Sequence, residues 1–487
     1  MPEHRTSIIP SAPTYHGVKG QLDYRAICAF AAIGFFLCSD TYWTELKALP
    51  VASDCKFDDS GDLISAKPYF SWHYEPRDIT FDQAVEEFTE LFERIVEDQT
   101  AGRRVILPLS GGLDSRTLAA ALKRAPSHVT ACSYRFEGGL DETEYSRKIA
   151  ETQEFPFFGW TVEPGYLWDV IDDLAPINGC FSEFTHPRQM AFSEKYRSLG
   201  DIFSLGHWGD VLFNDMGIED GLTMDKQAEV LLRKLVKKGG MELGAALWQV
   251  WGINGDFREY MAERIEGLLA AIAIPDSANA RIRAFKSMNW APRWTSVNLS
   301  IFESVRPIGV PYYDNRMCEF ICTVPERFLA GRKIQIEYLK RRAPALARIA
   351  WQEHRPFNLF NYQWDNAPWN LPSRALNKLE RVIKRKKYVQ RNWELQFLGE
   401  QNDMQLRARL FDGPHNRLIP KQLILDFYQR FTQIDPIYYS HSVSMLLTLG
   451  LFSEIHSAED YIGTERAAHC TSVTARGTQP SLGSWTV

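Results

Sequence analysis

Short apolar runs alternate with helix-length gaps between residues 104 and 206, and this alternation constrains the fold more than any other feature of the sequence. The runs read RVILPL, HVTACSYRF, FPFFGWTV and DIFSLG. The gaps have room for helices at 114–125 and 142–153, and for shorter helical pieces across 165–196. Strands that alternate with helices form a parallel sheet, because each crossover helix returns the chain to the same edge. We therefore predict an α/β fold with helices on both faces of a parallel sheet.

The flanking regions are predominantly helical. Apolar side chains recur every three to four residues at 79–102, which predicts an amphipathic helix. The run AICAFAAIGFFLC at 26–38 is shorter than the roughly 20 residues that cross a bilayer, so we interpret it as a buried helix. Asp-Ser-Gly-Asp at 59–62 is typical of a hairpin turn between short strands. From about 225 to 457 the pattern is mainly helical, with little strand signal.

Charge and cysteine content exclude several classes of protein. The 487 residues include 55 Lys and Arg against 61 Asp and Glu, a net charge of -6, so the chain has no general attraction for nucleic acid. The 8 cysteines are scattered without a C-x-x-C pair, which argues against a disulfide framework and a zinc knuckle. No secretory signal pattern is visible at the N-terminus. We expect a cytoplasmic protein without a membrane span.

The first strand of the α/β region turns into a helix through Ser110, Gly111 and Gly112. Backbone N–H groups converge at the N-terminus of a helix, and glycines let the backbone approach an anion closely. Ser115 can cap the helix or donate its hydroxyl to the anion. The turn is neither a G-x-x-x-x-G-K-[ST] loop nor a G-x-G-x-x-G loop. We predict a phosphate site outside those two nucleotide-binding folds.

Four collinear stretches resemble the synthetase domain of the glutamine-dependent asparagine synthetases and their relatives. SGGLDS at 110–115 resembles the pyrophosphate loop of the ATP pyrophosphatases. DETEYSRKIAETQEFPFFGWTV at 141–162 resembles the helix and strand that follow that loop. SLGHWGDVLFND at 204–215 resembles the second signature of the family, and ESVRPIGVPYYDNRMCEFICTVPERF at 303–328 resembles its Glu-Val-Arg-x-Pro-Phe-x-Asp segment. The resemblance implies an adenine nucleotide alpha hydrolase-like fold.

The resemblance also implies an activity. In the family, ATP adenylates a carboxylate with release of pyrophosphate, and an amine then displaces AMP to form an amide. The resemblance implies Mg²⁺ held by Asp114 and Asp210, and hard oxygen ligands suit that ion; by itself, Asp210 would be interpreted as a helix N-cap. The residues that the resemblance assigns to ATP are Leu109, Ser110, Gly111, Gly112, Leu113, Asp114, Ser115, Tyr134, Leu205 and Gly206.

Several positions depart from the family pattern. His207 stands where asparagine synthetases carry glutamate and the related β-lactam synthetases carry a tyrosine that helps to deprotonate the amine. An imidazole suits such general-base work near neutral pH, although a lone histidine is also often a structural hydrogen-bonder. Arg306 and Asp314 either order the acceptor side of the cleft or form a buried structural ion pair.

A lysine that stabilises the transition states in the family has no direct counterpart here. The strictest alignment of GRKIQIEYLKRRAP puts Glu337 at its position. Lys333 or Lys340 would reach the site only by a shift in register, and the alternative is that both are surface lysines. Our candidate catalytic residues are His207, Asp210, Lys333 and Arg306.

The glutaminase part of the family is not recognisable. Members that use glutamine expose a cysteine directly after the initiator methionine, where this chain has Pro2, and its first cysteine is Cys28. We predict a remnant of the glutaminase domain and linker at 1–82, a synthetase domain at 83–457 and a disordered tail at 458–487. Ammonia would then be free or come from a separate glutaminase, or the nucleophile would be another amine.

The leading hypothesis is an ATP-dependent carbon-nitrogen ligase of the asparagine synthetase type. Stand-alone relatives amidate sugar acids of surface polysaccharides or close peptide macrolactams, and these are alternatives within the enzyme class. A catalytically degenerate pseudo-synthetase that binds nucleotide is an alternative of another class. A tRNA-modifying enzyme with the same loop is disfavoured by the net charge of -6.

Overall fold

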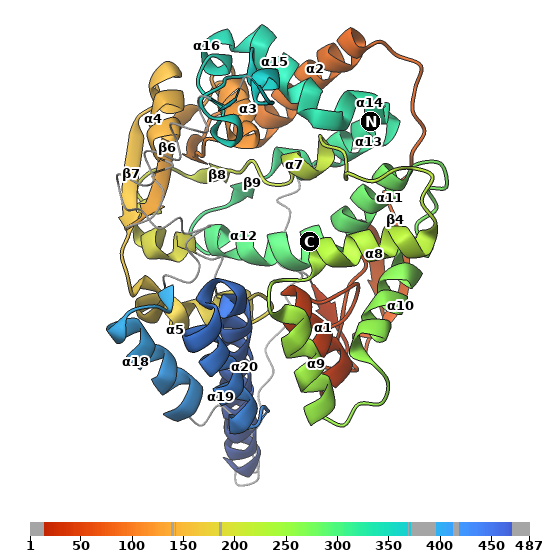
Figure 1. Ribbon diagram of the computed structural model, residues 1–487, viewed down its shortest axis with the longest axis vertical. Coiled ribbons are helices and arrows are strands. Elements are labelled where there is room, and N and C mark those ends of the chain that lie inside the picture. The colour runs from red at the N-terminus through yellow and green to blue at the C-terminus, as the bar shows by residue number, and fades with distance from the viewer. Residues whose placement is uncertain are drawn as a thin grey trace, which may run out of the picture.

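A five-stranded parallel sheet crosses the upper half of the molecule (Figure 1). Its spatial order is β7, β6, β5, β8, β9, and every neighbouring pair is parallel. The strands are β5 (Arg104–Pro108), β6 (His128–Phe136), β7 (Phe157–Val162), β8 (Ile202–Ser204) and β9 (Ile308–Gly309). Each of the four apolar runs contains one strand, so the predicted parallel sheet is confirmed. The fifth strand, β9, has only two residues and was not predicted.

The described part of the computed structural model excludes both ends of the chain and a few internal segments. It comprises residues 14–137, 141, 143–184, 188–368, 370–371, 396–412 and 418–469, with side chains of the last helix described through residue 456.

Helices cover both faces of the sheet, as predicted (Figure 1). One face carries α2 (Phe81–Thr100), α3 (Leu113–Leu122) and α15 (Lys333–Arg342), which pack against one another. The opposite side carries α5 (Tyr166–Asn178) and α12 (Ser296–Glu303). The remaining helices of this half are α4 (Thr143–Thr152), α6 (Ser193–Tyr196), α7 (Gly209–Leu212), α13 (Asn315–Thr323), α14 (Glu326–Leu329) and α16 (Pro344–Ala347).

The helix α2 begins at a sequence signal that is visible without the structure. The Thr80 side chain accepts a hydrogen bond from the backbone of Gln83, and the Gln83 side chain accepts one from the backbone of Thr80. This capping box satisfies two backbone donors that the first helical turn leaves free. The buried face of α2 includes Phe88 and Phe92, which stack at 5.3 Å between ring centroids. The amphipathic helix predicted at 79–102 is therefore confirmed.

The lower half of the molecule is helical, as predicted for the second half of the chain. It contains α8 (Met224–Leu235), α9 (Gly240–Val250), α10 (Phe257–Ala270), α18 (Glu400–Arg407), α19 (Lys421–Gln429) and α20 (Pro436–His469), and α11 (Ala278–Phe285) leads from these helices to the level of the sheet. The first part of the predicted tail at 458–487 lies in α20, and residues 470–487 lie outside the described residues. Among the described residues, no helix is long and apolar enough to cross a membrane.

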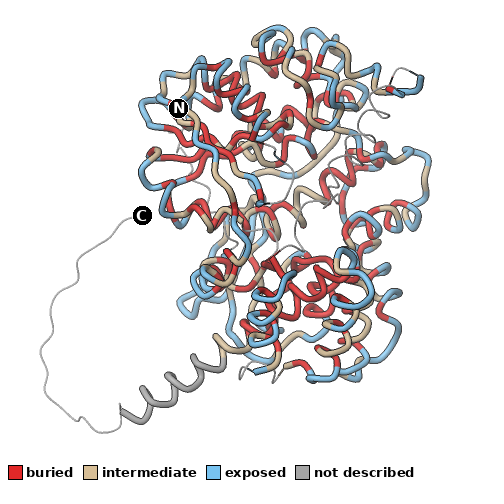
Figure 2. Tube along the Cα trace, turned by 60° about the vertical axis from the view of Figure 1, so that its left-hand side comes forward, coloured by how far each residue is buried: buried red, intermediate tan, exposed pale blue. Residues whose placement is uncertain are grey.

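An early segment of the chain forms part of this helical half. The helix α1 (Tyr24–Ile33) packs along α9, and all residues from Ala26 to Ile33 are buried. The chain leaves α1 at Gly34, whose φ of 82° is a left-handed conformation that glycine adopts without strain. Figure 2 shows buried segments in this half as well as around the sheet. The predicted buried helix is thus confirmed for 26–33.

Two small antiparallel pairs complete the fold. The first is β1 (Tyr15–His16) with β2 (Lys47–Ala48), and the second is β3 (Ser53–Phe57) with β4 (Leu63–Pro68). The predicted turn at 59–62 lies between β3 and β4, so the hairpin is confirmed.

Candidate active site

The glycine turn joins the end of β5 to the start of α3, at the carboxyl edge of the sheet. The Ser115 hydroxyl accepts a hydrogen bond from the backbone N–H of Ser110 at 3.1 Å and lies 3.0 Å from the Ser110 hydroxyl. The Ser110 hydroxyl in turn accepts a bond from the N–H of Gly112 at 3.3 Å. These bonds hold the turn in one conformation, with the N-terminus of α3 behind it. The geometry fits the phosphate site that the sequence predicts.

A buried arginine fixes the turn to a distant segment. The Arg116 guanidinium is fully buried and donates to the carbonyl oxygens of Gly111 at 3.1 Å, Ile349 at 2.9 Å and Ala350 at 3.0 Å. Burial lowers the pKa of Arg116 to about 10, so the group still carries its charge at neutral pH. These charge-assisted bonds tie the phosphate turn to the chain that follows α16.

Asp114 is the centre of a second polar cluster. Its carboxylate forms an ion pair with Arg332 and accepts a hydrogen bond from the Gln335 amide at 3.0 Å. Gln335 also donates to the Tyr312 hydroxyl at 2.9 Å and accepts from Arg332 Nε at 2.9 Å. Arg332 and Gln335 come from the start of α15, so this helix holds the carboxylate from one side. Burial raises the pKa of Asp114 to about 6, although Arg332 opposes the shift.

Asp210 lies against Asp114 from the other side. It is exposed, in the first turn of the short helix α7, and its backbone donates a hydrogen bond to the Asp114 carboxylate. The neighbouring Gly209 permits this approach, because a Cβ atom there would overlap Oδ1 of Asp114. The negative charge of Asp210 contributes to the raised pKa of Asp114.

These carboxylates fit a magnesium nucleotide better than a metal held by protein alone. No group of three or more His, Cys, Asp or Glu side chains within the described residues would hold a metal ion. Mg²⁺ is usually bound by one or two carboxylates, with waters and substrate phosphates in its remaining positions. A pair formed by Asp114 and Asp210 beside a phosphate turn is a donor set of this kind.

His207 lies between β8 and α7, half-buried and close to Asp210. Burial lowers the pKa of His207 to about 4, against the opposing charge of Asp210, so the imidazole is neutral at pH 7. Its Nδ1 is buried and has no hydrogen-bond partner among the described residues. The ring is therefore uncharged, as the general-base hypothesis requires, but its lowered pKa makes it a weaker base than an ordinary histidine.

Two cations at the site were not identified in the sequence. Arg332 is one, and Lys286 is the other. Lys286 is half-buried at the start of η2 (Lys286–Thr295), its Nζ 5.2 Å from the ring centre of Trp290. Burial lowers the pKa of Lys286, while the carboxylate of Asp210 opposes the shift. Neither residue stands at the aligned lysine position. The ion pair with Asp114 assigns Arg332 to the site, and the electrostatic interaction with Asp210 assigns Lys286 to it.

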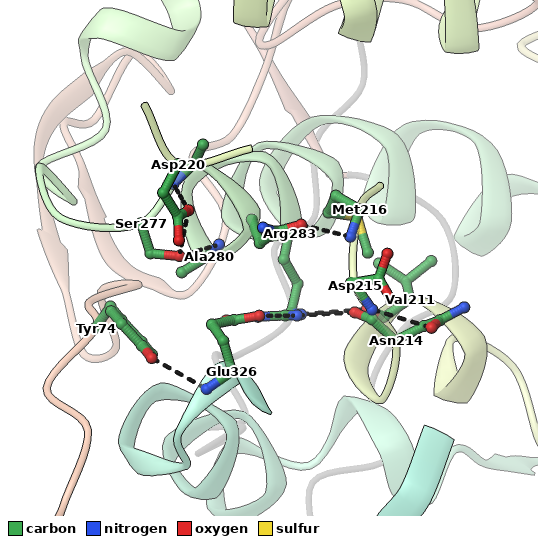
Figure 3. Close-up of polar contacts among 12 residues, drawn as sticks. Tyr74, Val211, Asn214, Asp215, Met216, Asp220, Ser277, Ala280, Arg283 and Glu326 are labelled. Carbon is green, nitrogen blue, oxygen red and sulfur yellow. Dashed lines mark hydrogen bonds and ion pairs between the residues drawn. The ribbon is translucent and has the colours of Figure 1, made fainter. Parts of the chain in front are cut away.

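A buried ion pair positions the helix that carries Asp210. Figure 3 shows the guanidinium of Arg283 between Glu326 and the chain around α7. Its Nη2 donates to Glu326 Oε2 at 2.8 Å and to the Asn214 carbonyl at 2.8 Å, and its Nε donates to the Val211 carbonyl at 3.3 Å. Arg283 is 1% exposed. Because the carbonyls flank the end of α7, this pair fixes α7 relative to α14.

The remaining predicted nucleotide residues lie at the same edge of the sheet. Leu109 donates its N–H to the Cys132 carbonyl at 2.8 Å, and Leu113 begins α3. Tyr134 lies near the carboxyl end of β6. Leu205 follows β8, and Gly206 packs against the backbone of Asp114 and Ser115.

The structure does not bring Arg306 to this site. Arg306 precedes β9 and donates to the carbonyls of Gly200 at 3.0 Å and Arg197 at 2.8 Å, which lie before β8. It is therefore at the amino edge of the sheet, opposite the phosphate turn, and its placement in the acceptor cleft is wrong. Its suggested ion pair with Asp314 is also wrong, because Asp314 caps α13 and pairs with Arg316 at 2.9 Å.

Lys333 lies on the outer face of α15. It is exposed, and its Nζ donates to the Arg327 carbonyl at 3.2 Å. Gln335, about 160° around the helix axis from Lys333, bonds to Asp114 from the opposite side of α15, and Arg332 at the N-terminus of the helix pairs with the same carboxylate. Glu337, at the aligned position of the family lysine, pairs with Arg341 at 2.8 Å. Lys333 is thus separate from the cluster that holds Asp114.

The parallel sheet with this turn at its carboxyl edge defines an α/β fold of the nucleotide-binding class. Residues 87–188 match the family model described as asparagine synthase, and they include the SGGLDS turn. The resemblance predicted from the sequence is confirmed for this segment. Asp210 and the stretch at 303–328 lie outside the match.

Solved structures and curated proteins provide two further comparisons. The NMN synthetase from Francisella tularensis matches with 16% sequence identity and a TM-score of 0.22, over 43% of this chain and 94% of that chain. No curated protein matches the chain.

Proposed function

We propose that the protein is an ATP-dependent synthetase that adenylates a carboxylate and then joins it to ammonia or another amine. One observation carries the proposal: Asp114, inside the segment that matches asparagine synthase, lies against Asp210 beside the SGGLDS turn. The turn provides backbone N–H groups for phosphate oxygens, and the two carboxylates suit Mg²⁺.

Each part of the site has a proposed role in nucleotide binding. The backbone from Ser110 to Ser115 holds the phosphates, and Leu109, Tyr134, Leu205 and Gly206 surround the base and ribose. Asp114 and Asp210 hold Mg²⁺, which when bound neutralises charge on the leaving pyrophosphate. Arg332 and Lys286 add positive charge beside the two aspartates, in the role that a lysine has in the family.

The proposed reaction has two steps. An oxygen of the substrate carboxylate attacks the α-phosphorus of ATP, and the bond to pyrophosphate breaks. The amine nitrogen then attacks the activated carboxyl carbon, and the bond to AMP breaks. We assign the proton that the amine loses to His207, because its imidazole is neutral at pH 7 and lies close to Asp210.

The substrate is proposed only by class. The acceptor is a small carboxylate, a sugar acid of a surface polysaccharide or a peptide carboxylate that closes to a macrolactam. The amine is free ammonia, ammonia from a separate glutaminase, or an amine of the substrate itself.

A second candidate function is nucleotide binding without turnover. The ion pair between Arg332 and Asp114 favours it, because the guanidinium occupies a carboxylate that Mg²⁺ would use. If the protein is an enzyme, the ion pair has to open when the magnesium nucleotide binds, or Asp114 has to contact Arg332 and Mg²⁺ at the same time. The two functions therefore differ in whether magnesium and ATP displace Arg332 from Asp114.

The test is pyrophosphate release from ATP and Mg²⁺ across a panel of carboxylic acids, each with and without ammonia. Asp114→Asn and Asp210→Asn are the test variants. Asp201→Asn is the matched control, because Asp201 also flanks β8 but pairs with Arg104 at the opposite edge of the sheet. Removal of Mg²⁺ with a chelator tests whether pyrophosphate release by the natural chain requires the metal ion.

We expect release that depends on one class of acid and on Mg²⁺, is lost in both test variants and persists in the control. An amide product in the presence of the amine would complete the assignment. ATP binding by calorimetry with no release for any acid would instead support the second candidate function. Absence of ATP binding would contradict both.

A further inference from the structure

A pocket of about 410 Å³ opens beside the outer face of α15, formed by this helix with the starts of α2 and α14 and with η6 (Tyr362–Trp364). Figure 1 shows α2, α14 and α15 close together at the top of the molecule. Ligand sites in proteins usually measure about 300–1,000 Å³, so this volume suits a small organic molecule.

The apolar part of the pocket wall is mainly aromatic. Phe81 and Phe328 meet edge to face at 5.4 Å between ring centroids, and Tyr362 and Ile336 complete the apolar lining. The three aromatic side chains are half-buried. Aromatic faces that remain partly open to solvent offer a flat apolar surface on which a planar ligand stacks.

Cations surround these rings. Arg327, Lys333 and Lys340 line the pocket, against one carboxylate, Glu337. Glu337 pairs with Arg341 at 2.8 Å, and Arg341 also pairs with Asp82, the residue after Phe81. The pocket therefore presents an excess of positive charge, which favours an anionic ligand.

The pocket is distinct from the candidate active site. Lys333, Glu337 and Lys340 follow one another on one face of α15, at three- and four-residue spacing. Gln335 is on the opposite side of the helix, where it bonds to Asp114, and Arg332 at the N-terminus of α15 pairs with the same carboxylate. Packing links the pocket to the phosphate turn only indirectly. The ring of Tyr362 lies 5.4 Å from that of Trp351, and the next residue, Gln352, lies against Gly111 in the turn.

We propose that this pocket is a second ligand site, which binds an organic anion with a flat apolar body. The aromatic walls would contact the body, and Lys333 and Lys340 would bind its carboxylate, sulfonate or phosphate group. The proposal does not depend on the reaction at the glycine turn, because none of the pocket residues contacts Asp114 or Asp210 in the interactions described above.

The experiment compares two probes of the same shape, 2-naphthoate and the neutral 2-naphthamide, by saturation-transfer NMR and calorimetry on the full chain without ATP. The test variant is Lys333→Gln with Lys340→Gln. The matched control is Lys56→Gln with Lys67→Gln, which removes the same charge from the exposed β3–β4 hairpin. Thermal unfolding of each variant verifies that it is folded.

We expect 2-naphthoate to bind the natural chain more tightly than 2-naphthamide. The test variant should weaken 2-naphthoate by about fivefold and leave 2-naphthamide unchanged, since only the anion uses the lysines. The control should change neither probe. Glu337→Gln should act in the opposite direction and strengthen 2-naphthoate, because it removes the one carboxylate of the pocket.

Three results would overturn the proposal. The first is equal affinity of the two probes for the natural chain. The second is the same loss in the control as in the test variant, which would indicate a general effect of net charge. The third is unchanged 2-naphthoate affinity in the test variant, which would locate the anion elsewhere.

Discussion

The guanidinium of Arg332 forms an ion pair with the carboxylate of Asp114, across 218 residues of sequence. The pair joins the helix that follows the phosphate turn to the helix α15, and Gln335 bonds to both partners. Both charges are largely withdrawn from water, so the electrostatic state of Asp114 depends strongly on Arg332.

Arg332→Gln should raise the pKa of Asp114 above its value of about 6, because the cation that stabilises the carboxylate is lost. If ionised Asp114 holds Mg²⁺, the acidic limb of the pH profile of pyrophosphate release should move to higher pH, with a lower rate at pH 7. Profiles between about pH 5 and 9 measure the shift. Arg341→Gln, on the outer face of α15, is the control and should leave the limb in place. An unchanged limb in Arg332→Gln would show that Asp114 does not set it.

Gly209→Ala should impair the site without unfolding the protein, since the new methyl group would displace the Asp114 carboxylate. We expect a loss of about 100-fold in pyrophosphate release, as is usual when catalytic groups are misplaced by about 1 Å. Gly221→Ala is the matched control, because a Cβ atom there meets nothing within 4 Å. Equal activity of the two variants would contradict the role of this contact.

Arg283→Met should lower the free energy of unfolding by about 3–5 kcal/mol, because it leaves the Glu326 carboxylate largely buried without its partner. Arg104→Gln breaks the exposed pair with Asp201 and should cost at most about 1 kcal/mol. Denaturant titration compares the two variants. The double variant Arg283→Met with Glu326→Leu should recover part of the loss, since it removes both charges. No recovery would mean that the hydrogen bonds to the carbonyls near α7 dominate.

His207 should make the folded state less stable in mild acid. Its pKa falls from the usual 6.5 to about 4 on folding, so the unfolded chain binds the proton more readily. The contribution is fully present above about pH 6.5 and is lost as the pH falls toward 4. Asp114 acts in the opposite direction, because its raised pKa lets the folded state keep a proton up to about pH 6.

The variant His207→Gln isolates the histidine from Asp114. Between about pH 7 and 4.5, the natural chain should lose about 1–2 kcal/mol more stability than the variant, since part of the imidazole still contacts water. Chemical denaturation at both pH values measures the difference. His128→Gln, at an exposed position, is the control and should behave like the natural chain. Identical losses in the natural chain and His207→Gln would contradict burial of the neutral ring.

The local pattern of the sequence predicted the elements that carry the phosphate turn. Alternating apolar runs identified β5 to β8, and the spacing of α2 with its cap identified that helix, because periodicity and capping are properties of neighbouring residues. The turn between β5 and α3 follows for the same reason. The strand β9 was missed, since its two residues form a strand only by pairing with β8.

The composition of the site depended on the tertiary structure. The family alignment directed attention to Glu337 and Lys333, yet the cations beside the two aspartates are Arg332 and Lys286. The residues around Arg306 in the sequence predicted that it lies in the cleft. The direction of β9 instead puts Arg306 at the amino edge of the sheet.

The physical reason is the difference between local and long-range interactions. Hydrophobic periodicity, turn residues and caps act over a few residues, so the sequence by itself determined four strands of the sheet, the helices between them and the phosphate turn. Which cation pairs with Asp114 depends on how α15 packs against that sheet, and which cation lies near Asp210 depends on how η2 packs. Those choices involve contacts between residues far apart in the chain, and only the tertiary structure decided them.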